Sequence, residues 1–239
     1  MTTPPAPAAP KAADFLARHR GGGLFTETVN QRIGSYCCVV AYRFGLAPTV
    51  LTVANLGLGL AASVTVVALA GAMAGGSVPA GPVLGLALLA WHLAYSLDCA
   101  DGQLARVTGR ASPAGGRVDV LADVAQQIAL VAAVSTVATA YEPDTPTWLV
   151  ASFVGTWMVN LVTSVLQQGA AASSLVTSSS LPIRLVKLIR DYGAVVTAVG
   201  LVLALAPQLT VWLLAAFTLV NGGFLVVSIA AAARASLRA

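Results

Sequence analysis

The chain has 239 residues, of which 57% are hydrophobic and 9% are charged, and its net charge is +4. Soluble domains carry about 25% charged residues, so the composition excludes a soluble enzyme, a coiled coil and a disordered regulator. The cysteines follow no zinc or disulfide pattern, and no Lys/Arg run with interleaved aromatic residues indicates nucleic-acid binding. The sequence therefore predicts an integral membrane protein.

The N-terminal region is predicted to combine a tail with a helix at the membrane surface. Residues 1–13 are rich in Pro, Ala and Thr and predict a flexible tail. Over residues 24–45, apolar side chains recur at near-helical spacing with polar and charged residues between them. This pattern is typical of an amphipathic helix that lies in the bilayer interface. We expect residues 14–239 to form a single membrane domain that includes this helix.

Six apolar stretches follow the amphipathic helix. They cover residues 49–73, 80–97, 117–140, 147–168, 190–206 and 209–232 and end at Gly, Pro, polar or charged residues. Because a bilayer crossing needs about 20 apolar residues, we expect an all-α integral membrane protein with six transmembrane helices after the interfacial helix.

The charges indicate how such a protein is oriented. With six spans, all 13 Lys and Arg residues fall on one side of the membrane, and the opposite loops carry only the charges of Glu142 and Asp144. The positive-inside rule then places both termini in the cytoplasm. We expect a multi-pass protein of the plasma membrane, and the bias toward Ala, Val, Leu and Gly favours a bacterial source.

Four acidic residues lie where the second span ends and the third begins. Asp98 and Asp101 are spaced i, i+3, and Asp119 and Asp123 are spaced i, i+4, so each pair shares one face of its helix. A short turn around residues 107–116 would bring the two pairs together. Crowded carboxylates at a membrane border need cations, and oxygen ligands favour Mg²⁺, Mn²⁺ or Ca²⁺ over zinc. We therefore predict a site for two divalent ions, which suits chemistry on a phosphate ester or diphosphate.

Small and basic residues accompany the aspartates. Gly102 and Gly115 leave space for a bulky ligand, and Ala105 keeps the same face thin. Arg106 and Arg110 offer positive charge to phosphate oxygens. From these residues alone, solvated carboxylates at helix ends and an ion-binding site in a transporter are alternatives.

The pattern Asp-x2-Asp-Gly-x2-Ala-Arg-x8-Gly-x3-Asp-x3-Asp over residues 98–123 resembles the signature of the CDP-alcohol phosphotransferases, also called CDP-alcohol phosphatidyltransferases. The six-span layout and the preceding amphipathic helix are also similar to this family. The resemblance implies an enzyme that transfers a substituted phosphate from a CDP-linked donor to an alcohol hydroxyl and releases CMP. It also implies a homodimer.

The resemblance assigns roles to the residues of the motif. It implies that Asp98, Asp101 and Asp119 bind a divalent metal, Mg²⁺ or Mn²⁺. It implies that Asp123 contributes to the metal site and acts as the general base, and a carboxylate beside metal ions can accept a hydroxyl proton. The residues implied to contact the cytidine nucleotide are Asp98, Gly102, Ala105, Arg106 and Gly115.

The substrates are less well defined by the sequence. We expect CDP-diacylglycerol as the donor, in phospholipid biosynthesis, because a lipid donor fits a six-span chain whose site opens at the bilayer border. A water-soluble CDP-alcohol with a lipid acceptor is the alternative. A divalent-cation transporter would carry its acids at mid-membrane, and a polyprenyl transferase would lack the Asp-Gly-x2-Ala-Arg continuation. No run in the sequence identifies the acceptor alcohol.

A further set of polar and basic residues provides candidate contacts to the acceptor or to phosphate: Arg32, Arg110, Arg117, Asn160, Gln167, Arg184 and Lys187. Hydrogen bonding between helices explains the polar face around Asn160 at least as well. Anionic lipid head groups are an equal explanation for Arg184 and Lys187. We expect His92, in the second span, to pack between helices rather than to act in catalysis.

Overall fold

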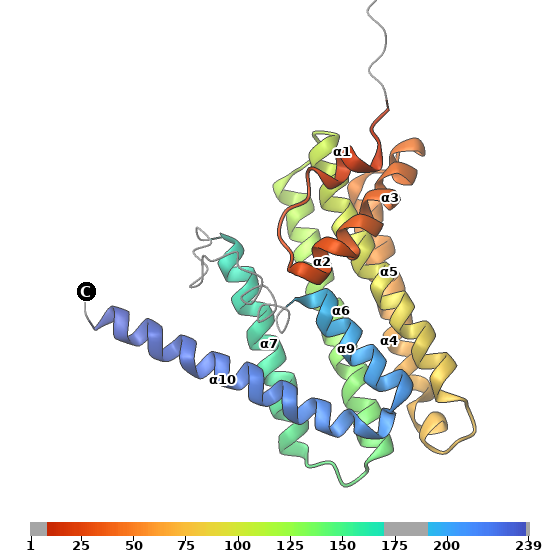
Figure 1. The fold of residues 1–239 in the computed structure, drawn as a ribbon, viewed down its shortest axis with the longest axis vertical. Helices are drawn as coiled ribbons and strands as arrows, with labels where there is room; N and C mark the ends of the chain where they lie inside the picture. The colour runs from red at the N-terminus through yellow and green to blue at the C-terminus, as the bar shows by residue number, and fades with distance from the viewer. Residues whose placement is uncertain (1–8, 170–190, 238–239) are drawn as a thin grey trace, which may run out of the picture.

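The computed structural model describes residues 9–169 and 191–237, and the secondary structure of these residues is helical (Figure 1). Three helices form the N-terminal region: α1 (Ala12–Leu16), α2 (Leu24–Thr28) and α3 (Asn30–Arg43). The remaining elements are α4 (Pro48–Ala74), α5 (Ala80–Val107), α6 (Pro113–Tyr141), α7 (Thr147–Gly169), α9 (Tyr192–Leu205), the 3-10 helix η2 (Pro207–Leu209) and α10 (Thr210–Ser236).

Four segments of the described chain are long and apolar enough to cross a membrane. These are α4, α5, α6 and Pro207–Val227, which joins η2 to most of α10. The described residues of α7 and α9 contain shorter apolar stretches, Thr147–Val162 and Tyr192–Leu205. The prediction of an all-helical chain is confirmed, and the four segments fit a membrane protein. The number of six crossings stays a prediction.

The second and third predicted spans are longer than the sequence indicates. Helix α5 continues to Val107, and α6 begins at Pro113, where the Ser112 side chain accepts a hydrogen bond from the backbone N–H of Gly115 at 3.0 Å. Pro in the first turn and Ser at the N-cap both favour this start. At 1.5 Å per residue, helices of 28 and 29 residues are roughly 42 Å long, which exceeds a hydrocarbon core of about 30 Å. Each of these helices is therefore longer than one straight crossing requires.

The N-terminal region differs from its prediction in two places. Residues 1–8 of the predicted tail lie outside the described residues, and α1 already begins at Ala12. The predicted single helix over residues 24–45 is two helices. The backbone at Val29, with φ −113° and ψ −71°, departs from regular helical geometry between α2 and α3.

Helix α3 packs on α5 through a small and polar face. A Cβ atom at Gly34 would lie 2.8 Å from the backbone oxygen of Ser96, so only glycine permits this close approach. The outward side chains of Tyr36 and Val40 are 68% and 55% exposed. Exposed apolar side chains on this helix fit contact with a membrane surface, although its interfacial location stays a prediction.

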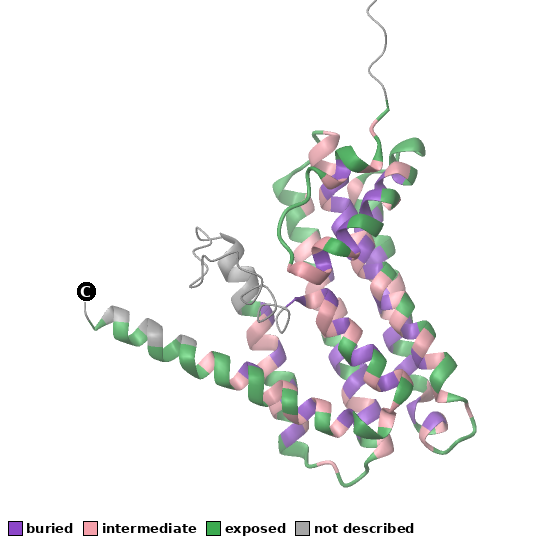
Figure 2. Ribbon diagram, viewed as in Figure 1, coloured by how far each residue is buried: buried purple, intermediate pink, exposed green. Residues whose placement is uncertain are grey.

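Helices α4, α5 and α6 form the centre of the bundle, with α4 in contact with both others. Helix α9 lies against α5, and α7 contacts α10 (Figure 1). In the central helices the buried residues lie on the inward-facing sides, whereas much of α10 is exposed (Figure 2). The core is formed largely by small and branched side chains, including Val66, Ala70, Ala87, Val134 and Val137. Such side chains allow membrane helices to pack closely.

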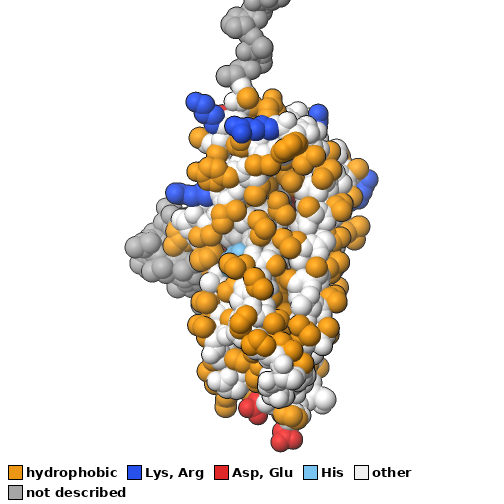
Figure 3. Space-filling view, turned by 90° about the vertical axis from the view of Figure 1, so that its right-hand side faces the viewer, with side chains coloured by type: hydrophobic (Ala, Val, Ile, Leu, Met, Phe, Trp, Pro, Cys, Tyr) orange, Lys and Arg blue, Asp and Glu red, His pale blue; other side chains and the backbone are white. Residues whose placement is uncertain are grey.

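Charge is distributed unequally along the bundle. On the face in Figure 3, Lys and Arg side chains lie toward the end that carries α1, and most of the visible acidic side chains lie at the opposite end. Glu142 and Asp144 are exposed in the connection between α6 and α7. This asymmetry is the one on which the predicted orientation depends, and the orientation itself stays a prediction.

Candidate metal and nucleotide site

Three carboxylates converge where α5 and α6 approach their connecting turn. One carboxylate oxygen from each of Asp98, Asp101 and Asp119 lies within 4.8 Å of the other two. The turn between the helices is short, and Gly109 adopts a positive φ of 68° that favours glycine. The spacing of the aspartates and this turn thus produce the convergence that the sequence predicts.

Asp123 lies beside this group, although its oxygens are not among the three that gather most closely. Its carboxyl group interacts directly with that of Asp98, one side chain coming from each helix. It also interacts electrostatically with Asp119, one turn earlier on α6. The four aspartates therefore form one acidic cluster, with Asp123 farther along α6 from the turn.

The cluster fits a divalent cation. Oδ1 of Asp119 is buried and has no hydrogen-bond partner among the described residues, and leaving a buried carboxylate oxygen unpaired is costly. Three carboxylate oxygens at mutual distances within 4.8 Å match the hard oxygen ligands that Mg²⁺ and Mn²⁺ prefer. Asp98, Asp101 and Asp119 could hold such an ion between α5 and α6.

Polar residues of α4 and α6, which the sequence analysis missed, hold the carboxylates in place. The hydroxyl of Thr52 donates to Oδ2 of Asp101 at 2.5 Å, and Nδ2 of Asn55 donates to Oδ1 of Asp98 at 3.1 Å. Nε2 of Gln126 in turn donates to Oδ1 of Asn55. The sequence does contain a signal for these three residues: each is a polar residue within an apolar span, where an uncharged polar side chain usually has a buried partner.

A cavity of about 210 Å³ opens beside the cluster and contains most of the predicted nucleotide contacts. It is lined by Asp101 and Asp119 and by the predicted residues Gly102, Ala105, Arg106, Arg110 and Gly115. A Cβ atom at position 102 would lie 2.9 Å from Nη1 of Arg106. Glycine at this position therefore also leaves room for the arginine side chain.

The other predicted contacts are not gathered at this cavity. Arg32 on α3 and Arg117 on α6 are exposed and line neither this cavity nor the one beside it, and Asn160 is half-buried on α7. The side chain of Gln167 and the residues Arg184 and Lys187 lie outside the described residues.

His92 bridges three helices, as a packing role predicts. One ring nitrogen lies 2.9 Å from the hydroxyl of Thr197 on α9, and the other lies 3.3 Å from the side-chain nitrogen of Asn30 on α3. The ring therefore links α5 to both neighbouring helices.

Comparison with known proteins identifies the chain's family. A comparison with curated proteins found no match. The model of the CDP-alcohol phosphatidyltransferase family matches residues 45–222. This range contains the whole acidic cluster, all the motif residues and every residue that lines the adjoining cavity. Members of this family transfer substituted phosphate groups and generally depend on a divalent metal. The chain therefore belongs to the CDP-alcohol phosphatidyltransferase family and is a transferase of substituted phosphate groups.

Proposed function

We propose that this enzyme transfers the phosphatidyl group of CDP-diacylglycerol to the hydroxyl group of an alcohol and releases CMP, as a step of phospholipid biosynthesis. The observation that carries the proposal is the group of three carboxylates beside a glycine-lined cavity. This site lies near the adjoining ends of two helices that are longer than a hydrocarbon core, and we expect these ends to lie toward the membrane surface. A donor with a polar nucleotide and two acyl chains suits such a border.

The motif residues divide into two groups in this proposal. Asp98, Asp101 and Asp119, with a contribution from Asp123, would hold two ions of Mg²⁺ or Mn²⁺, which would neutralise the diphosphate and stabilise the leaving CMP. The cavity beside them accepts the nucleotide, and its contacts come from Asp98, Gly102, Ala105, Arg106 and Gly115. Arg110, at the rim of the cavity, adds a positive charge for phosphate oxygens.

Asp123 is the proposed general base. The acceptor oxygen forms a bond to the donor's β-phosphorus, the bond from that phosphorus to the oxygen of CMP breaks, and the hydroxyl proton moves to the Asp123 carboxylate. Its place beside Asp98 but farther from the turn supports a base that faces the acceptor rather than the nucleotide. A general base contributes roughly 10²- to 10⁴-fold to a rate.

The remaining features of the proposal concern the whole molecule. We expect residues 14–239 to act as one six-span domain in the plasma membrane of a bacterium, with both termini in the cytoplasm, and to form a homodimer as family members commonly do. The unequal charge at the two ends of the bundle supports this orientation. The family assignment supports neither a cation transporter nor a polyprenyl transferase.

The test is to measure CMP release by the purified protein with Mg²⁺, CDP-diacylglycerol and a panel of acceptors that includes glycerol phosphate, inositol phosphate, inositol and serine. A second arm combines water-soluble CDP-alcohols with diacylglycerol. We expect CMP only with CDP-diacylglycerol and one acceptor, no release by Asp98→Asn, and normal release by Asp144→Asn, whose carboxylate is exposed in the α6–α7 connection. Release only in the second arm would show that the donor is a water-soluble CDP-alcohol rather than CDP-diacylglycerol. No release in either arm would contradict the proposal.

A further inference from the structure

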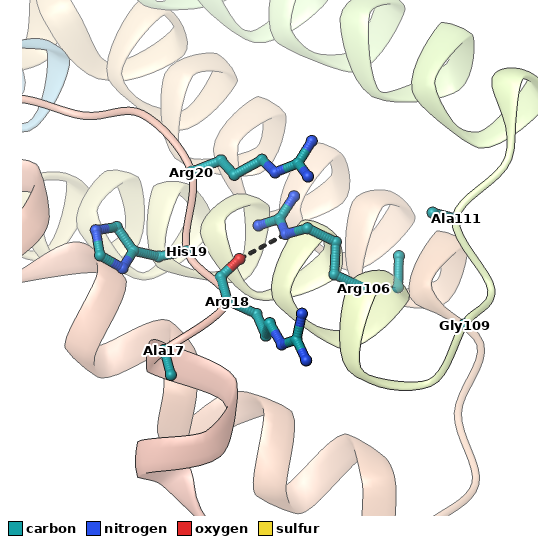
Figure 4. A pocket seen from close by; sticks show the side chains of 8 residues that line it. Ala17, Arg18, His19, Arg20, Arg106, Gly109 and Ala111 are labelled. Atoms are coloured by element: carbon teal, nitrogen blue, oxygen red, sulfur yellow. Dashed lines mark hydrogen bonds between the residues drawn. The ribbon is translucent and has the colours of Figure 1, made fainter.

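A second cavity, of about 440 Å³, lies beside the nucleotide cavity. It is formed between the connection that follows α1, which contributes Arg18, His19 and Arg20, and the end of α5, which contributes Arg106 (Figure 4). The two cavities share Arg106, together with two alanines. Asp101 and Asp119 line the smaller cavity, and none of the four aspartates lines the larger one.

The larger cavity is strongly cationic. Three arginines and a histidine line it, and the described residues of its lining include no Asp or Glu. Figure 4 shows the guanidinium groups of Arg20 and Arg106 close to each other, and their charges act on each other. Like charges repel each other, and an anion between them offsets this repulsion because it attracts both. The arrangement therefore favours a bound anion.

Arg106 is held in a position that leaves it free to bind this anion. Its Nε donates to the backbone oxygen of Arg18 at 2.6 Å, and a guanidinium has five N–H donors in all. The N–H groups of its two terminal nitrogens thus remain for a ligand. The contact also ties the connection after α1 to the end of α5, so that Arg18, Arg20 and Arg106 line one cavity.

We propose that this cavity binds a phosphate group, through Arg18, Arg20 and Arg106. Planar guanidinium groups match the oxygens of phosphate in paired hydrogen bonds, and the volume is that of a small-molecule site. The phosphate comes either from free phosphate compounds of the aqueous phase or from the head group of an anionic lipid. Because Arg106 also lines the nucleotide cavity, phosphate in the larger cavity fixes one wall of the nucleotide cavity.

The test uses binding rather than turnover, so it does not depend on the proposed function. The thermal unfolding midpoint of the full chain, without donor, is titrated with inorganic phosphate at constant ionic strength in neutral detergent. A second arm compares the protein in vesicles of phosphatidylcholine with vesicles that also contain phosphatidylglycerol. The variants are Arg20→Gln, Arg18→Gln and their double variant. Arg43→Gln is the matched control, because Arg43 is an exposed arginine at the end of α3 that lines neither cavity.

We expect one phosphate source to raise the midpoint of the wild type and of Arg43→Gln. In the single variants the concentration of this phosphate source that gives half of the full midpoint shift should rise roughly tenfold or more, as loss of a charged hydrogen bond implies. The midpoint of the double variant should not change. A response to inorganic phosphate identifies free phosphate, and a response only to phosphatidylglycerol identifies a lipid head group. No response to either source, or an equal loss in Arg43→Gln, would overturn the site. Failure of the wild type to release CMP would instead count against the proposed function.

Discussion

Replacing Asn55 by leucine tests whether the buried contacts of α4 tune the metal site. Asn55 is fully buried, its Nδ2 donates to Oδ1 of Asp98 at 3.1 Å, and its Oδ1 accepts from Gln126. Leucine has a similar size but no donor, so Asn55→Leu leaves the carboxylate of Asp98 without this support. The aspartates themselves are unchanged.

The size of the effect follows from this single hydrogen bond. A hydrogen bond to a charged group contributes about 1.5–3 kcal/mol, and losing a partner that orients a metal ligand typically costs roughly 10- to 100-fold in metal affinity. We therefore expect the Mg²⁺ concentration for half-maximal CMP release to rise roughly 10- to 100-fold in Asn55→Leu. The rate at saturating Mg²⁺ should be largely retained, because Asp123 and the cavity are unchanged.

The assay is CMP release as a function of Mg²⁺ concentration, with Ser63→Ala as the control. Ser63 is also buried on α4 and also loses a hydrogen bond, from Trp91, but it does not contact the aspartates. The double variant Asn55→Leu/Gln126→Leu should behave like Asn55→Leu alone, since Gln126 acts through Asn55. The reasoning is refuted if Asn55→Leu shows the Mg²⁺ dependence of the wild type, or if Ser63→Ala shows the same shift.

Three further predictions concern the aspartates and the topology. CMP release should stop in EDTA and return with Mg²⁺ or Mn²⁺, and Asp98→Asn should remain inactive at every metal concentration; activity of this variant in EDTA would contradict the metal site. Asp123→Asn should lower kcat at least about a hundredfold while donor binding changes much less; a parallel collapse of donor binding would make Asp123 chiefly a metal ligand. In intact cells an impermeant thiol reagent should label Ser77→Cys and Asp144→Cys but not Arg110→Cys, and labelling of Arg110→Cys would invert or remove the six-span orientation.

The native cysteines should contribute little background to the labelling experiment. Cys38 is fully buried, and burial raises the pKa of its thiol to about 12. Burial also raises the pKa of the Cys37 thiol. A raised pKa keeps a thiol protonated near neutral pH, and the protonated form reacts poorly. Cys99 is 8% exposed. The wild type, labelled in parallel, measures the background that these residues leave.

The acidic cluster could be predicted because its geometry is local. Spacings of three and four residues fix Asp98 with Asp101, and Asp119 with Asp123, on single helix faces. The turn that joins the two helices is short, so the last turns of α5 and the first turns of α6 must lie near each other. Sequence separation within the cluster is therefore small, and regular helix geometry places the side chains without knowledge of the rest of the bundle.

The supporting residues could not be predicted in the same way. Thr52 and Asn55 lie on α4, and their contacts with the aspartates depend on how α4 is rotated and shifted against α5. That register follows from the packing of small side chains along both helices, which a single sequence does not specify. A Cβ atom at Gly59 would collide with the side chain of Gln126, so a glycine one turn after Asn55 also sets the approach of α6.

The contacts of Asp191 also could not be predicted from the sequence, because they join residues that lie far apart along the chain. The sequence indicates only that a span begins near it, yet its carboxylate accepts hydrogen bonds from the backbone N–H of Phe25 at 2.8 Å and from the hydroxyl of Thr26 at 2.5 Å, and it caps α9. Asp191 thus fixes α2 to α9, while Arg106 fixes the connection after α1 to α5 through the Arg18 carbonyl. The N-terminal segment is consequently held at two points, one of them a residue of the family motif. Arg106 therefore joins the nucleotide cavity to a segment that precedes the first membrane helix, which explains how a basic cavity formed partly by residues outside the motif can lie against the nucleotide site.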